Sequence, residues 1–149
     1  MQLGTSSNQP EFSMKISRYS IYYVPDGPLG KFGASWLGWD IQAREFVPLL
    51  HIEVNKIDLN KITEEPRTYV FHGMLKAPFR LNAQKTEKEL IADFEEFCRN
   101  QPSVCSEKLV LTIMGNFIAL APARQSETIS HLTQNCVTFF DHYRAPLNN

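Results

Sequence analysis

A single histidine, His72, lies at the centre of the most aromatic and aliphatic stretch of this chain, residues 68–81. Prolines before and near the end of the stretch favour a strand between them. Because successive strand side chains alternate between faces, His72 shares one face with Val70, Met74 and Lys76. Such a mixed face is more typical of a cleft than of a packed core. Imidazole titrates near neutrality, so His72 is a candidate general acid or base.

Basic side chains beside this strand are candidate ligands for an anion. Lys76 lies on the His72 face, and Arg67 directly precedes the strand, so either can contact a phosphate group. The alternative for each of them is a solvated surface cation. The alternative for His72 is a structural histidine whose hydrogen bonds are satisfied within the surface of the sheet.

The same stretch carries a family resemblance. Residues 69–81, Tyr-Val-Phe-His-Gly-Met-Leu-Lys-Ala-Pro-Phe-Arg-Leu, resemble the first signature motif of the LigT-like two-histidine phosphoesterases, in a family linked to phosphonate breakdown. Residues 18–23, 32–38 and 140–147 resemble further segments of that family, so the resemblance spans nearly the whole chain. It implies a metal-independent hydrolase of small cyclic phosphates, without a cofactor, in which His72 is one of two acid–base histidines.

Two departures from the family pattern limit that expectation. The family motif is His-x-Thr, and Met74 stands at the threonine position, where a thioether has no proton to donate to phosphate. Family members continue into a second lobe with a second motif, whereas this chain stops at Asn149. The triplet at 131–133 spells His-Leu-Thr but falls in a predicted helix, where residues two apart point roughly 200° apart. We therefore expect weak or absent activity, with a non-catalytic remnant or a dimeric binding module as alternatives.

Hydrophobic periodicity and breaker residues predict an α+β fold with a mainly antiparallel sheet and helices on one face, like a single LigT-like lobe. The uncovered face would hold His72. The expected order is a strand at 17–24, a helix at 29–37, an irregular segment at 40–55, a helical turn at 58–62, the His72 strand, a helix at 86–100, a hairpin at 108–121 and a helix from Ser126. Thr86 and Glu89 have the spacing of a capping box, and the helix at 86–100 is expected to pack on the sheet through Leu90, Phe94 and Phe97. The hairpin is expected to turn at Gly115-Asn116, and the last helix has an apolar stripe at helical spacing. Residues 1–13 are polar and are expected to be a disordered extension, which leaves 14–149 as one domain.

Composition narrows the class of partner. The 149 residues are 43% hydrophobic and carry a net charge of −1, which gives no electrostatic footprint for nucleic acid. No apolar run approaches membrane-spanning length and the N-terminus lacks a signal pattern, so we expect a cytoplasmic protein. The three cysteines have no metal-binding or disulfide spacing. The expected partners are a small phosphorylated molecule and, through the sheet face of His72, a second copy of the chain.

Overall fold

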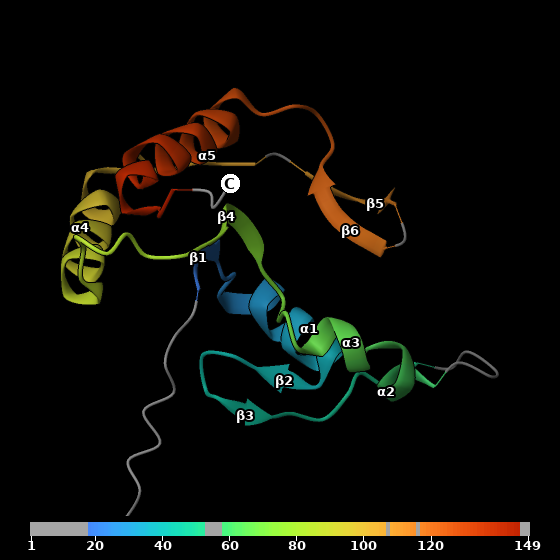
Figure 1. The fold of residues 1–149 in the computed structure, drawn as a ribbon. Helices are drawn as coiled ribbons and strands as arrows, with labels where there is room; N and C mark the ends of the chain where they lie inside the picture. Colours follow the sequence, from blue (N-terminus) through green and yellow to red (C-terminus); the bar gives the residue numbers. More distant parts are fainter. Residues whose placement is uncertain (1–17, 53–57, 107, 116, 147–149) are drawn as a thin grey trace, which may run out of the picture.

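Helices and antiparallel strands are combined in the structure, a computed structural model that describes residues 18–52, 58–106, 108–115 and 117–146. The predicted α+β class is confirmed. The strands described form three separate two-stranded sheets, where the sequence predicted one: β1 (Tyr19–Tyr23) with β4 (Gly73–Phe79), β2 (Trp39–Asp40) with β3 (Glu45–Phe46), and β5 (Leu109–Met114) with β6 (Phe117–Pro122) (Figure 1). The extension predicted at 1–13 lies outside the described residues.

Except at residues 64–67, where no helix was predicted, the described helices begin close to the positions that the sequence predicts. They are α1 (Gly27–Leu37), α2 (Leu59–Ile62), α3 (Glu64–Arg67), α4 (Glu87–Asn100) and α5 (Glu127–Phe139), followed by the 3₁₀ turn η1 (Asp141–Tyr143). The capping box expected at the start of α4 is present. The Thr86 hydroxyl accepts a hydrogen bond from the Glu89 amide at 3.2 Å, and the Glu89 carboxylate accepts one from the Thr86 amide at 2.8 Å.

The main core lies between the β1–β4 sheet and the helices α4 and α5 (Figure 1). Its buried side chains come from all four elements and from η1: Ile21, Phe79, Leu90, Phe97, Cys136, Phe140 and Tyr143. Leu90 and Phe97 confirm the predicted apolar face of α4, but Phe94 is wrong as a core residue, since it remains 36% exposed. Phe94 lies at the rim, with its ring 6.2 Å from the buried ring of Phe140.

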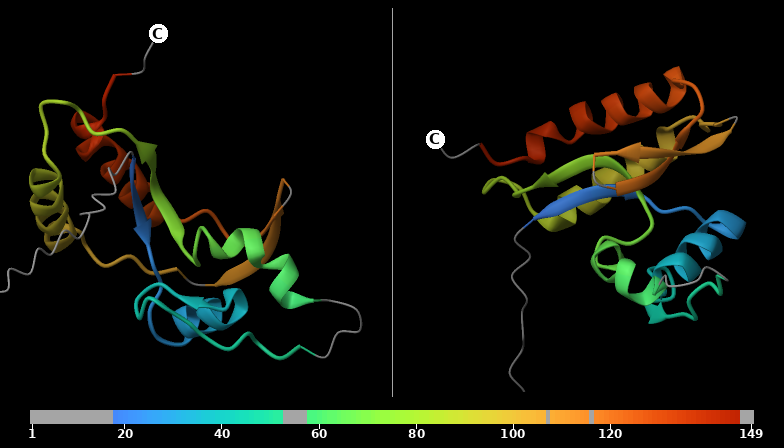
Figure 2. Two further views of the ribbon diagram at one scale, coloured as in Figure 1. Left: turned by 60° about the horizontal axis from the view of Figure 1, so that its bottom comes forward. Right: turned by 90° about the vertical axis from the view of Figure 1, so that its right-hand side faces the viewer.

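A second group of elements, α1 to α3 with the β2–β3 hairpin, lies on the side of the β1–β4 sheet away from α5 (Figure 2). Gly38 ends α1 in the left-handed conformation, φ +74°, and its amide donates to the carbonyl of Ala34 at 2.7 Å. Gly33 is buried in α1 against the ring of Phe71, where a β-carbon would overlap that ring. The missing side chain of Gly33 therefore lets the segment before β4 lie directly on α1.

The predicted His72 strand is shorter and less regular than expected. β4 begins at Gly73, so His72 precedes the strand, and Val70 has φ +58°. The ladder with β1 shifts register twice, between Tyr19 and Ile21 and again between Ile21 and the next residue. Each shift changes which side chains share a face. The predicted common face is therefore wrong: Lys76 is buried under α5, while Met74 is 51% exposed.

Candidate functional site

His72 is half-buried at the point where the chain enters β4. Its Nδ1 lies 3.0 Å from the carbonyl oxygen of Val70, and its ring packs on Tyr22 of β1 with the centroids 3.9 Å apart. A carbonyl oxygen can only accept, so this contact is a hydrogen bond when Nδ1 carries the proton. In the neutral ring, Nε2 then keeps its lone pair and can act as a base.

The backbone before His72 holds this arrangement. Val70 is β-branched, and such a residue at φ +58° is an uncommon and strained conformation. The turn it makes places its carbonyl within reach of the imidazole two residues later. Phe71, between them, packs against Gly33 of α1. A strained residue and a close helix contact thus fix the position of one histidine, and strain of this kind is common at functional sites.

Met74, at the position of the family threonine, lies opposite Tyr22 in the β1–β4 ladder and is mostly exposed. Its thioether is a weak acceptor and donates no hydrogen bond. The side chain at this position therefore provides no hydroxyl for a substrate, although the resemblance implies one there. Any catalysis by His72 would have to proceed without that donor.

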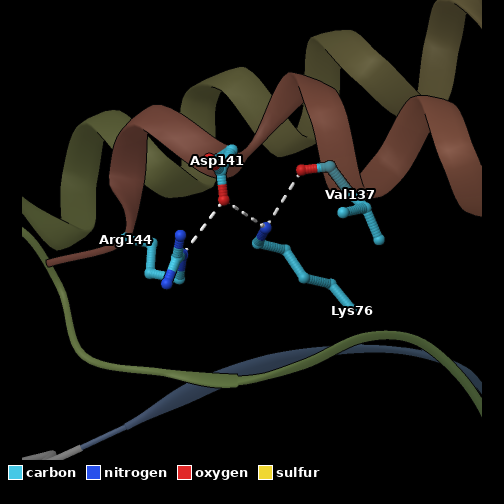
Figure 3. A network of polar contacts seen from close by, with 4 residues as sticks. All are labelled: Lys76, Val137, Asp141 and Arg144. Atoms are coloured by element: carbon cyan, nitrogen blue, oxygen red, sulfur yellow. Dashed lines mark hydrogen bonds and ion pairs between the residues drawn. The ribbon is translucent and has the colours of Figure 1, made fainter. Parts of the chain in front are cut away.

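Lys76 lies inside the fold, with 5% of its surface exposed (Figure 3). Its ammonium group donates to the carbonyl of Val137 at 3.0 Å and lies 3.6 Å from a carboxylate oxygen of Asp141. Arg144 donates to the same carboxylate oxygen at 3.0 Å, and this bond is the main cause that holds the pKa of Asp141 below its usual value. Lys76 thus satisfies a carbonyl in the last turn of α5, where a cation also complements the helix dipole.

Arg67 is similarly engaged with its own chain. Its Nε donates to the carbonyl of Leu37 at the end of α1. Its Nη2 donates to the side chains of Asn60 at 2.8 Å and Thr63 at 3.2 Å. The guanidinium therefore joins α1, α2 and α3. Neither this contact nor that of Lys76 was evident from the sequence, because each depends on a helix end that is distant along the chain.

The three other histidines lie elsewhere: His51 follows β3, His131 is on α5 and His142 is in η1, where its ring contacts Tyr143. The triplet 131–133 is helical, as predicted, and the Thr133 hydroxyl donates to the carbonyl of Ile129. Among the residues that the structure describes, no group of three potential metal ligands gathers. Burial raises the pKa of the Cys136 thiol, which keeps it neutral beside Lys76.

The fold and the site together define an α+β protein in which one half-buried histidine is presented beside an antiparallel strand pair. Residues 74–149 match the family described as "Protein of unknown function (DUF1045)", and the chain belongs to that family. No helix of the described residues is both long and apolar enough to cross a membrane.

A curated relative also matches most of the chain. It is a ribose 1,5-bisphosphate phosphokinase PhnN from Janthinobacterium sp. (strain Marseille), 35% identical over 138 residues. That alignment covers 91% of this chain and 30% of the relative, so the chain spans less than a third of that protein's length. No solved structure matches the chain.

Proposed function

We propose that this chain is a phosphoesterase-like lobe associated with phosphonate metabolism, in which His72 is the acid–base group acting on a small phosphorylated molecule. The observation that carries the proposal is the hydrogen bond between His72 Nδ1 and the Val70 carbonyl. It fixes the ring and leaves Nε2 as the nitrogen that can exchange a proton with a substrate. The resemblance over residues 69–81 supplies the chemical class.

The relative supports phosphorylated carbohydrates as the substrate class. Its name describes a kinase of a ribose bisphosphate, and most of the present chain aligns with it. A five-membered cyclic phosphate of a sugar is the small ester that two-histidine chemistry would open. We place the reaction in the cytoplasm, as expected from the sequence.

The described site supplies only part of the machinery for this reaction. Lys76 and Arg67 would have to leave the Val137 and Leu37 carbonyls to reach a phosphate, so we assign them no substrate contact. Met74 stands where the family has a hydroxyl donor, so that hydrogen bond to the phosphate is missing. His72 is then the one assigned acid–base group, and such a group raises the reaction rate by about 10²- to 10⁴-fold. The proposed turnover is therefore feeble.

The proposal is tested by measuring hydrolysis of a cyclic sugar phosphate by the wild-type chain and two variants. His72→Ala should abolish the activity. Met74→Thr should raise it about tenfold, the worth of one neutral hydrogen bond of about 1.4 kcal/mol. His131→Ala is the matched control, because that histidine is exposed on α5 and should leave the rate unchanged. Robust turnover that survives His72→Ala would refute the assignment.

A second candidate function is binding without turnover, and the exposed thioether of Met74 favours it. In that case inorganic phosphate should shift the ring NMR signals of His72 while no cyclic ester is consumed. The His72→Ala variant should lose phosphate binding, and the His131→Ala control should retain it. Unchanged His72 signals at saturating phosphate would exclude an anion site at this histidine.

A further inference from the structure

The β5–β6 hairpin presents an unusual apolar surface. Residues 109–122 contain no charged side chain. Leu111, Ile113 and Ile118 are 75%, 80% and 72% exposed. The hairpin lies to one side of the β1–β4 sheet and its helical cover (Figure 1). Exposed strands in soluble proteins normally carry charges or prolines that prevent pairing with other chains, and only Pro122 at the end of β6 serves that purpose here.

The hairpin's register gathers its largest aliphatic side chains on one face. Leu111 lies opposite Leu120, and Ile113 opposite Ile118. Directly opposite residues of an antiparallel pair point to the same side, so these four side chains form one continuous surface. Leu109 and Pro122 extend it at the open end. We call these six residues the aliphatic face.

A two-stranded hairpin is marginally stable in water unless one face packs against something. Among the described residues, β5 and β6 pair only with each other. Four side chains of the aliphatic face, those of Leu109, Leu111, Ile113 and Ile118, are exposed to solvent, and those of Leu120 and Pro122 are half-buried. The sequence nevertheless specifies a regular six-pair ladder here. An apolar surface that is regular, exposed and without charge indicates that its partner is also an apolar, uncharged surface.

We propose that the aliphatic face is the contact of a two-fold homodimer, in which the β5–β6 hairpins of two copies pack face to face. At these exposed fractions, the side chains of the aliphatic face present on the order of 500 Å² of accessible surface per copy. Two copies would therefore bury about 1,000 Å² in total, the lower limit for a specific interface. A flat aliphatic surface is its own complement, as a two-fold contact requires. The area predicts a weak dimer, with a dissociation constant in the micromolar range.

This contact differs from the one expected beside His72. Met74 and Tyr23 are exposed there, but they lie on a short ladder whose register shifts twice. The aliphatic face is larger and uniformly apolar. The proposal concerns another surface and does not depend on the catalytic role of His72.

Sedimentation equilibrium of the full chain from about 5 to 200 micromolar tests the proposal, since this range spans the expected dissociation constant. The wild type should pass from monomer to dimer. Ile113→Lys places a charge in the contact and should raise the dissociation constant at least about 30-fold, the effect of losing a strong contact residue. Ile113 is almost fully exposed, so the monomer should keep its far-ultraviolet circular dichroism.

Two matched variants locate the contact. Ile113→Leu keeps the volume and should preserve the dimer. Met74→Lys adds the same charge at another exposed apolar residue, on β4, and should also preserve it. A wild type that is monomeric throughout the range overturns the proposal. So does assembly beyond a dimer, or dissociation caused by Met74→Lys while Ile113→Lys has no effect.

Discussion

Lys76→Met tests whether the buried ammonium group stabilises the fold or binds a ligand. Methionine keeps most of the side-chain length over the Phe79 ring, which lies 5.4 Å from the Lys76 nitrogen. It removes the hydrogen bond to the Val137 carbonyl and the ion pair with Asp141. The substitution thus separates the effect of the ammonium charge from the effect of packing the aliphatic part of the Lys76 side chain.

The expected loss of stability follows from these contacts. A hydrogen bond from a charged donor contributes about 1.5–3 kcal/mol, and removing it leaves the Val137 carbonyl without this partner. The loss is offset in part because the variant no longer keeps an ammonium group out of water. Asp141 is more than half exposed, so its share is small. We expect Lys76→Met to destabilise the protein by about 1–2 kcal/mol.

Urea unfolding followed by circular dichroism measures this effect. With a slope of about 2 kcal/mol per molar urea, the midpoint should fall by roughly 0.5–1 M. Lys88→Met on α4 is the matched control, because Lys88 is exposed and should leave the midpoint unchanged. Phosphate binding, followed through the His72 ring signals, should be the same in both variants.

An unchanged midpoint for Lys76→Met would refute the structural role. If the same variant also lost phosphate binding, the original expectation from the sequence, a lysine that contacts the substrate, would be correct. A fall in stability with phosphate binding intact would support the network drawn in Figure 3.

Three further substitutions probe the segment before β4 and the core. Val70→Gly should be more stable in urea than Val70→Ala by about 1 kcal/mol, because only glycine relieves a φ of +58°; the usual order, with alanine more stable, would contradict the strain. Gly33→Ala should cost about 1–3 kcal/mol of unfolding free energy although alanine favours helices, because its β-carbon meets the Phe71 ring; a stabilised variant would show that the contact is loose. Burial and the 2.6 Å bond to Asp93 raise the pKa of Tyr143 from 10.0 to about 12, so its neutral form is favoured by folding. That stabilisation is complete below pH 10 and is lost as the pH rises toward 12, and alkaline unfolding of Tyr143→Phe should lack this component.

Local signals predicted the elements of this fold well. The capping box at Thr86 and Glu89, the glycine near the β5–β6 turn and the apolar spacing of α5 each depend on a few neighbouring residues. Gly115 has φ +60°, as a tight turn requires, and Asn116 lies outside the described residues. Such features form wherever the local sequence occurs, so they can be recognised without knowing the tertiary structure.

The geometry of the candidate site could not be predicted in the same way. Alternation along 70–76 assumes a regular strand, but β4 begins only at Gly73 and its register against β1 shifts between Met74 and Lys76. The burial of Lys76 depends on the last turn of α5, which lies 61 residues further along the chain at Val137. The role of His72 and the oligomeric state stay predictions. The contact between His72 and Tyr22 also required the register of two strands that are distant in sequence.

The pairing of β1 with β4 has a consequence for how the chain folds. These strands enclose a loop of about fifty residues, and closing it costs conformational entropy before the core contributes any stability. The β5–β6 hairpin requires only a tight turn and should form within microseconds. The uncharged strands of this hairpin should therefore pair transiently while the core is still incomplete. We therefore expect the yield of refolding to fall as the protein concentration rises, because these apolar strands are exposed before the core is complete.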